Sequence, residues 1–254
     1  MPRLRAHALP TLMAALCLLL CGCGQDVPPQ SAVLDAIETP LAAAPGTLRH
    51  RGAEVLLEVE NILQNPELPN GCEATSLAIV LNYFGVDAGK TDLALNYIPR
   101  MDFQNGGGHP EYVYMGDPST ANGFYCYPRP VVIAATMYLE DHPALLRAYL
   151  ATGSTEDDLV AFLDEGLPVM VWKTTDNQPP ALRGDLAWTL LGTDRVYTPY
   201  GNLHVAVLRG YDEDNFYLCD PLGITESMAR ADFMANYTAM GSRAVVVRPQ
   251  LPQE

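Results

Sequence analysis

One cysteine stands where the sequence predicts the start of a helix. Residues 70–73 have the form of a capping box, with Asn70 as the N-cap and Glu73 at the third helical position. Cys72 then lies in the first turn, where unpaired backbone N–H groups and the helix dipole favour an anion, so we expect its thiol to ionise below the ordinary pKa of about 8.5. Glu73 and the acidic net charge of the chain oppose this effect. A nucleophilic Cys72 therefore needs a cationic partner.

His204 is the best candidate for that partner. It begins a predicted strand whose hairpin partner ends at Asp220, with a turn at residues 212–215 between them. Positions equidistant from a turn face each other, so we expect His204 and Asp220 to be neighbours to within about one register step. Asp220 would then fix the imidazole tautomer, His204 would take the thiol proton, and Cys72 would attack an acyl carbon. The alternative is a strand histidine with a structural hydrogen bond only.

The negatively charged intermediate of such an attack needs hydrogen-bond donors. Gln64, eight residues before Cys72, can supply a side-chain N–H beside the backbone N–H of Cys72. The alternative is a loop glutamine that faces water. This chemistry needs no metal ion and no cofactor, and we predict neither.

Helices early in the chain and strands late in it are predicted to position these residues. Apolar residues at helical spacing indicate a helix over residues 70–84, ended by Gly85. A second helix, over residues 154–165, begins with the capping residues Ser154 and Thr155. Other predicted helices are 129–141 and 230–237, and the predicted strands are 53–60, 168–173, 204–210, 216–220 and 243–248. This order predicts the α+β class with an antiparallel sheet.

A long segment rich in glycine and proline, residues 99–130, separates the first two helices. Structureless loops of this length are usually functional or disordered. Six aromatic residues argue against disorder: Phe103, Tyr112, Tyr114, Phe124, Tyr125 and Tyr127. We interpret the segment as a packed loop that walls a substrate groove, with a purely structural crossover as the alternative.

The segments around these residues resemble a known family. The run from Gln64 to Ser76, continued by residues 82–85, is similar to the start of the papain-like peptidases related to the bacteriocin-processing, double-glycine peptidases. Further matches resemble the stand-alone branch of that family, and they lie at residues 123–128, 166–172, 204–211 and 220–222. The resemblance covers residues 53–248.

This resemblance implies a papain-like cysteine peptidase fold, with a helical amino-terminal part that carries the nucleophile and a carboxy-terminal antiparallel sheet. It implies a peptide or protein substrate and these roles: nucleophile Cys72, base His204, orienting residue Asp220 and oxyanion donor Gln64. Bacteriocin-processing peptidases are commonly joined to an exporter. The sequence contains neither transmembrane helices nor a nucleotide site, so cleavage of a leader at a double glycine is not implied.

The amino terminus has the three parts of an export signal, namely Arg3 and Arg5, an apolar stretch over residues 12–20, and small residues. Residues 20–23 resemble the lipobox of bacterial lipoproteins, in which a lipidated cysteine, here Cys23, becomes the first residue. Cys21 departs from that pattern, since alanine or serine usually stands there. Plain secretion and an uncleaved anchor are therefore the alternatives.

The predicted organisation is a lipoprotein signal peptide at residues 1–22, a tether rich in proline and alanine at 23–50, and the peptidase domain at 51–250. Lipid on Cys23 would hold the exported protein on a bacterial membrane, on the cell-envelope or periplasmic side. The oligomeric state is not predicted.

The net charge excludes one class of partner. The chain has 15 basic and 30 acidic residues, and removal of residues 1–22 leaves 13 basic residues and a net charge of −17. No basic cluster interrupts this excess. Binding to nucleic acid through phosphates is therefore not expected.

Three cysteines remain after the signal segment and Cys23, namely Cys72, Cys126 and Cys219. Three is an odd number, so in an oxidising compartment one thiol stays free or pairs between chains. Cys126 with Cys219 is the pair expected if a disulfide forms. The alternative is that all three are small buried residues with free thiols.

Two other functions are compatible with the same residues. An acyl transferase would use the same triad with an amine in place of water. A binding module would keep the papain-like shell without turnover.

Overall fold

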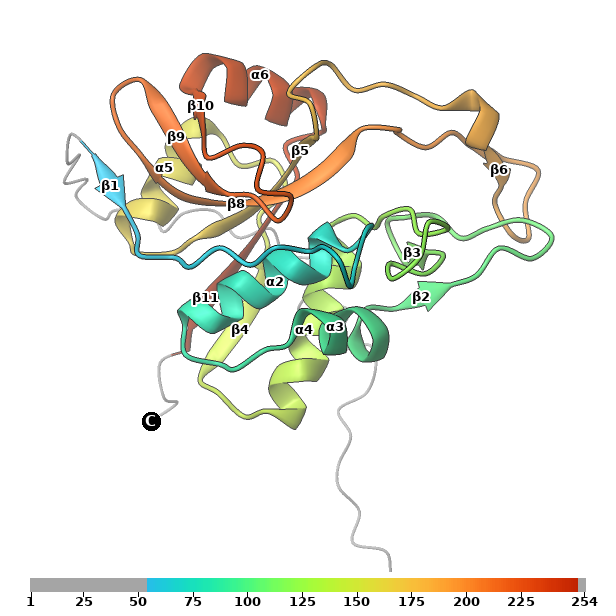
Figure 1. Ribbon diagram of the computed structural model, residues 1–254, viewed down its shortest axis with the longest axis horizontal. Coiled ribbons are helices and arrows are strands. Elements are labelled where there is room, and N and C mark those ends of the chain that lie inside the picture. The colour runs from blue at the N-terminus through green and yellow to red at the C-terminus, as the bar shows by residue number, and fades with distance from the viewer. Residues whose placement is uncertain (1–53, 251–254) are drawn as a thin grey trace, which may run out of the picture.

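A seven-stranded antiparallel sheet forms the centre of the computed structural model, which describes residues 54–250 (Figure 1). In chain order its strands are β1 (Val55–Leu56), β4 (Leu146–Leu150), β5 (Val169–Thr174), β8 (Leu203–Tyr211), β9 (Asn215–Cys219), β10 (Ser227–Ala229) and β11 (Ala244–Pro249). They lie in the order β10-β9-β8-β5-β11-β4, and β1 also pairs with β8. Together with the helices, this sheet confirms the α+β class.

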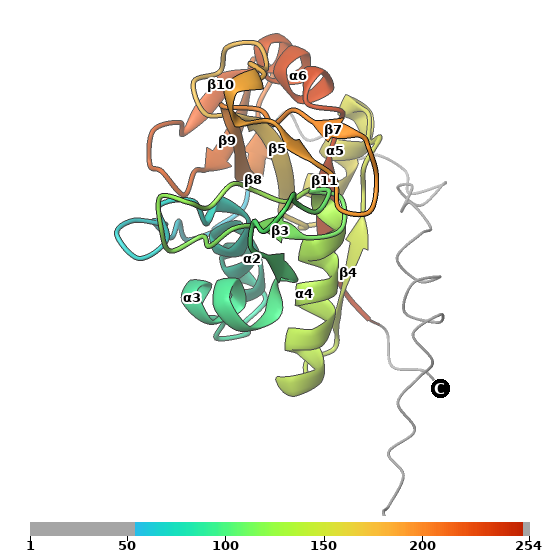
Figure 2. The ribbon, with the colours of Figure 1, turned by 90° about the vertical axis from the view of Figure 1, so that its right-hand side faces the viewer.

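Helices cover both faces of the sheet (Figures 1 and 2). The helices α2 (Cys72–Tyr83) and α4 (Pro128–Asp141) lie on one face, and α5 (Glu156–Asp164) and α6 (Arg230–Ala239) lie on the other. Side chains alternate along a strand, so β5 contributes Met170 and Trp172 to the first hydrophobic cluster and Val169 and Val171 to the second. All six residues of β5 are buried, which is the pattern of a strand covered on both faces.

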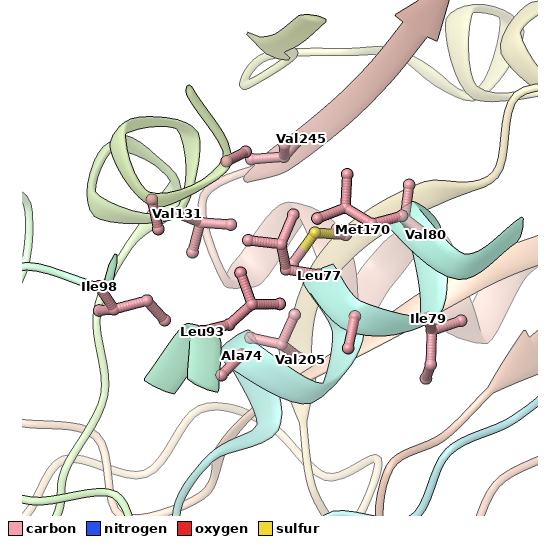
Figure 3. Close-up of a cluster of buried hydrophobic side chains, with 14 of the residues drawn as sticks. Ala74, Leu77, Ile79, Val80, Leu93, Ile98, Val131, Met170, Val205 and Val245 are labelled. Atoms are coloured by element: carbon pink, nitrogen blue, oxygen red, sulfur yellow. The ribbon is translucent and has the colours of Figure 1, made fainter. Parts of the chain in front are cut away.

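Helix α2 is the most enclosed helix near the centre of the fold. Ten consecutive residues, 72–81, are buried, and a helix that is covered all round belongs to the core. One side packs on the sheet, and the other packs on α4 and on the turn formed by α3 (Lys90–Asp92) and a π-helical segment (Leu93–Tyr97). Figure 3 shows Leu77 of α2 among Leu93, Val131 and Met170 from these neighbours. This packing fixes the position of the amino-terminal turn of α2.

The predicted helices are confirmed to within a few residues, and one predicted strand is much shorter than expected. Thr155 caps α5 through a reciprocal pair of hydrogen bonds with Asp158, as the capping signal indicated. The strand expected at residues 53–60 is limited to Val55–Leu56, because the chain leaves the edge of β8 after Leu57 donates to the carbonyl of Arg209. The sequence also gave no indication of β4 and β10, which are short strands at the two edges of the sheet.

The loop at residues 99–130 is packed, as predicted. It contains β2 (Arg100–Met101) and β3 (Tyr114–Met115), which pair in parallel. A second long connection, residues 175–202, joins β5 to β8. It contains a short 3₁₀ helix (Gly184–Leu186) and the paired strands β6 (Trp188–Thr189) and β7 (Val196–Tyr197). The Trp188 ring lies against Phe103 and Phe124, with centroids 5.1 and 5.3 Å apart. We call residues 175–202 the arm; it extends beside the loop in Figure 1.

Among residues 54–250, no helix combines the length and the apolar character needed to cross a membrane. The predicted signal peptide at 1–22, the lipidation site at Cys23 and the tether at 23–50 lie outside the described residues. Those predictions, and the domain boundaries that depend on them, stay predictions.

Candidate active site

His204 and Asp220 meet inside the protein. Nε2 of His204 lies 2.7 Å from Oδ1 of Asp220, and both side chains are almost completely buried. The same Oδ1 atom accepts a hydrogen bond from the backbone N–H of Leu222 at 2.8 Å, which orients the carboxylate. The contact through Nε2 leaves Nδ1 as the ring nitrogen available to a second partner. The structure therefore brings together the two residues that the hairpin argument expected to be neighbours.

Cys72 is the first residue of α2, but the predicted capping box is wrong. Gly71 occupies the N-cap, and no side chain caps the helix. Asn70 instead donates from Nδ2 to the carbonyl of Thr120 at 2.7 Å, which ties the start of α2 to the loop 99–130. A Cβ atom on Gly71 would lie 2.6 Å from Cβ of Leu68, so glycine permits the close turn that leads into the helix.

The first turn of α2 docks on strand β8 next to His204. The pairing of β8 with β9 ends at Val207 and Cys219, which leaves the start of β8 without a strand neighbour on that side. Ser76 donates to the carbonyl of Val205 at 3.3 Å, and the backbone of Val205 also interacts with the thiol of Cys72. The sulfur thus lies against the residue that directly follows His204.

Burial and charge keep this thiol protonated in the resting protein. Burial and, after it, the carboxylate of Glu73 raise the pKa of Cys72 well above its ordinary value, while the Val205 backbone lowers it. Burial also lowers the pKa of His204, and Asp220 opposes that shift. Desolvation and Glu73 therefore outweigh the helix amino terminus, which was expected to lower this pKa against the opposing charge of Glu73. A neutral thiol and a neutral imidazole result.

Glu73 points into the protein rather than back to the N-cap. Its Oε1 atom accepts from the backbone N–H of Cys126 at 2.7 Å, and its Oε2 atom lies 3.4 Å from Sγ of Cys72. Burial raises the pKa of this carboxyl to about 7. The sequence showed that an acid follows the cysteine but not that the acid is buried beside the sulfur, because its hydrogen-bond partner is 53 residues away.

Gln64 lies in the interior and not in water, so the alternative considered for it is wrong. Only 2% of its surface is exposed. Its backbone N–H donates to the carbonyl of Pro221 at 2.8 Å, next to Asp220, and its Nε2 donates to the carbonyl of Pro69 at 2.8 Å. Gln64 therefore connects the segment before Cys72 with the segment after Asp220.

Lys173 is a charged residue near the site that the sequence reasoning did not single out. It is fully buried and lies opposite His204 in the register of β5 and β8. Its Nζ atom donates to the carbonyl of Thr174 at 2.8 Å. A lysine that closes an otherwise apolar strand, residues 168–173, was the signal that could have identified it.

A pocket of about 730 Å³ adjoins the segments that carry the site, although its lining includes none of Cys72, His204 and Asp220. The loop 99–130 and the arm supply most of its wall, and Asn70 and Leu203 place it next to the start of α2 and of β8. Phe103, Phe124 and Tyr200 give the wall aromatic surface. The loop therefore lines a pocket, and the substrate groove expected there stays a prediction.

All three cysteines of the described domain are free and buried, so the expected pair of Cys126 with Cys219 is wrong. The sulfur of Cys219 donates to the carbonyl of Val59, while Cys126 packs against Glu73 in the first hydrophobic cluster. Within residues 54–250, no group of three or more histidine, cysteine or acidic side chains is arranged to hold a metal ion.

Comparison with known proteins gives consistent results. The model of the Peptidase_C39 like family matches residues 56–245. The uncharacterised protein YvpB of Bacillus subtilis (strain 168) is 35% identical over 191 residues, which span 74% of this chain and 73% of YvpB. The crystal structure of a C39-like peptidase from Bacillus anthracis is similar with a TM-score of 0.66 and 33% identity, over 77% of this chain and 97% of that one.

Proposed function

Because the chain belongs to the Peptidase_C39 like family, we propose that it is a cysteine peptidase in which Cys72 attacks the carbonyl carbon of a peptide bond. The observation that carries the proposal is the His204–Asp220 contact at the point of β8 where the thiol of Cys72 meets the backbone of Val205. A nucleophile, a base and a carboxylate that orients the base are the groups that acyl transfer requires.

The proposed reaction begins with a proton transfer. Nε2 of His204 is engaged by Asp220, so Nδ1 takes the proton of the Cys72 thiol. The sulfur then bonds to the carbonyl carbon, and the electron pair of the C=O bond moves to the oxygen. Asp220 carries its charge throughout, because hydrogen bonds from His204 and Leu222 and the positive charge of Lys173 outweigh burial and hold its pKa below the ordinary value. This charge favours the imidazolium that forms.

The oxyanion would be held by two donors, the backbone N–H of Cys72 and Nε2 of Gln64. In the resting protein this amide donates to Pro69, so it must turn from that carbonyl to the oxyanion. When the intermediate collapses, the C–N bond breaks and His204 returns the proton to the departing amine. Water then hydrolyses the thioester, with His204 as the base, and the thiol of Cys72 is restored.

We also propose that the peptidase is exported and anchored by lipid to a bacterial membrane, on the cell-envelope or periplasmic side. The support is the sequence alone, namely the export signal over residues 1–22 and the cysteine of the lipobox at Cys23. The peptide substrate would enter through the pocket between the loop 99–130 and the arm, which adjoins Asn70 and Leu203.

The test combines cleavage with chemical labelling, using the full chain. A pooled library of synthetic peptides, read by mass spectrometry, should show cleavage by the wild type and none by Cys72→Ala. Because His204 is the proposed base for a thiol that rests protonated, iodoacetamide at a fixed pH should label Cys72 faster in the wild type than in His204→Ala. Cys219→Ala, which removes another buried thiol, is the matched control and should change neither result. If no peptide is cleaved and Cys72 is labelled at the same rate in the wild type and in His204→Ala, the domain is a binding module and the proposal fails.

A further inference from the structure

The reaction described above uses the buried Lys173 only as a charge that helps to keep Asp220 ionised. Lys173 lies at the end of β5, and its cross-strand partner on β8 is His204. The adjacent pair in the same register is Trp172 with Val205, whose carbonyl accepts a hydrogen bond from Ser76 of α2. Strands β5 and β8, which carry this pair, are neighbours in the centre of the sheet (Figure 1).

The stability of the fold does not explain this lysine. The side chain is fully buried, and its single hydrogen bond goes to the carbonyl of the next residue, Thr174. Within residues 54–250, no carboxylate oxygen comes within 4.0 Å of Nζ to form an ion pair. A buried charge without a close partner is costly, and an apolar side chain of similar length usually folds as well or better. The reason for a lysine must therefore lie in what it faces.

The charged and titratable groups around Lys173 come from four segments. His204 lies on β8, Asp220 follows β9, Asp176 follows β5, and Cys72 begins α2, with Glu73 beyond it. Burial lowers the pKa of Lys173, whereas Asp220, Asp176 and Cys72 raise it, so anionic groups favour the ammonium form. A nearby positive charge would in turn favour the Asp220 carboxylate, because its Oδ2 atom is buried without a hydrogen-bond partner among the described residues.

We propose that Lys173 is a positioning residue whose buried positive charge stabilises the Asp220 carboxylate and the Cys72 thiolate, and so sets the pH range in which the nucleophile is active. This inference rests on the proposed function. Lys173 acts through these groups and does not touch the substrate. Because the charge of Glu73 disfavours the thiolate of Cys72, a positive charge besides the imidazolium of His204 is needed, and Lys173 supplies it.

The sign of the effect follows from the charges. Without the positive charge, the thiolate of Cys72 is less stable and its pKa rises. The imidazolium of His204 is repelled less, so its pKa rises as well, in accord with the lowering that Lys173 now causes. Both limbs of a bell-shaped pH profile should therefore move to higher pH together. A merely structural defect would lower the height of the profile without moving it.

The experiment compares five full-length proteins by the pH dependence of Cys72 alkylation and by thermal unfolding. They are the wild type, Lys173→Met, Lys173→Gln, His204→Ala and Arg248→Met. The last removes the same charge from a surface ion pair with Glu165 and is the control for net charge. The alkylation rate of Cys72 rises with pH, and the midpoint of this rise should move up by about one pH unit in both Lys173 variants. In Arg248→Met the midpoint should stay at the wild-type pH. The Lys173→Met protein should unfold at the same temperature as the wild type or a higher one.

The outcomes separate this inference from the proposed function. If Lys173→Met has the wild-type limb while His204→Ala loses it, the peptidase proposal stands and the role of Lys173 is refuted. If Lys173→Gln restores the wild-type limb, the hydrogen bond to Thr174 matters and not the charge, which also overturns the inference. If the wild type itself titrates like an ordinary thiol and His204→Ala superimposes on it, the proposed function fails first.

Discussion

His204 and Asp220 are in contact through Nε2 and Oδ1, at 2.7 Å, although the strands that carry them stop pairing at Val207 and Cys219. This divergence gives the site its geometry. It opens the edge of β8 to the first turn of α2, where Ser76 and Cys72 interact with the backbone of Val205. A hairpin paired to its ends would have filled that edge with β9.

Two substitutions of Asp220 should separate orientation from charge. Asp220→Ala removes the acceptor for His204 and should lower peptide cleavage by about 100-fold or more. Asp220→Asn keeps an oxygen that can accept from Nε2 but loses the negative charge, so the loss should be smaller, about 10-fold. Steady-state cleavage rates measure both. Asp214→Ala, in the turn of the same hairpin, should have the wild-type rate. Equal activity of Asp220→Ala and the wild type would exclude Asp220 from the mechanism.

The buried carboxyl of Glu73 predicts a pH-dependent stability. Its pKa is about 7 in the folded protein against an ordinary 4.5, so the folded state binds the proton more tightly. The free energy of unfolding should therefore fall as the pH rises through this interval. In the wild type this fall should reach up to about 3 kcal/mol between pH 5 and pH 8, and in Glu73→Gln it should be absent. Urea unfolding at the two pH values measures the difference.

The same variant should make Cys72 more reactive, because the negative charge beside the sulfur disappears. The alkylation rate at pH 8 measures this effect. Glu67→Gln, at an exposed ion pair with Lys90, is the control and should leave both the unfolding and the alkylation results unchanged. A Glu73→Gln protein with the wild-type pH dependence of unfolding would show that this carboxyl is not held protonated by burial.

Gly71 should be sensitive to the addition of a single methyl group. In Gly71→Ala the new Cβ would lie 2.6 Å from Cβ of Leu68, and overpacking of this kind destabilises by roughly 1–3 kcal/mol. Cleavage should fall as well, since the start of α2 must shift. Gly89→Ala is the matched control: it is also an N-cap with a negative φ, and its nearest neighbour for a Cβ, Asp92, is 3.7 Å away. Equal unfolding free energies for the two variants would contradict the close contact.

The three domain cysteines should all be reduced in the exported protein. Alkylation after unfolding, without a reductant, should modify Cys72, Cys126 and Cys219 in full, because each thiol is free and buried in the folded domain. Peptide mapping by mass spectrometry measures each site separately. A mass loss of two hydrogens on a peptide pair that joins Cys126 to Cys219 would contradict the structure.

Membrane attachment should depend on Cys23. We expect the wild type to sediment with bacterial membranes and Cys23→Ala to appear in the soluble fraction or to keep its uncleaved signal. Intact mass of the mature protein should show lipid on Cys23. A soluble, unmodified wild type whose sequence begins elsewhere would favour plain secretion.

Sequence patterns predicted the elements that carry the site better than the contacts within it. The helix of Cys72 and the hairpin of His204 and Asp220 are visible in local periodicity and turn chemistry, which act between residues close in the chain. The predicted N-cap, Asn70, is wrong, because its side chain donates a hydrogen bond to the carbonyl of Thr120, 50 residues later. The edge strands β4 and β10 were not predicted, because each forms only through hydrogen bonds with its neighbour in the sheet.

By itself, the sequence determined the α+β class and the candidate residues Cys72, His204, Asp220 and Gln64, together with the acidic charge of the domain. Tertiary structure decided their electrostatics. It buried Glu73 against the thiol, set Lys173 opposite His204, and turned the amide of Gln64 toward Pro69. The physical reason is that desolvation and Coulomb interactions depend on distances between segments far apart in the chain, and no local pattern encodes those distances.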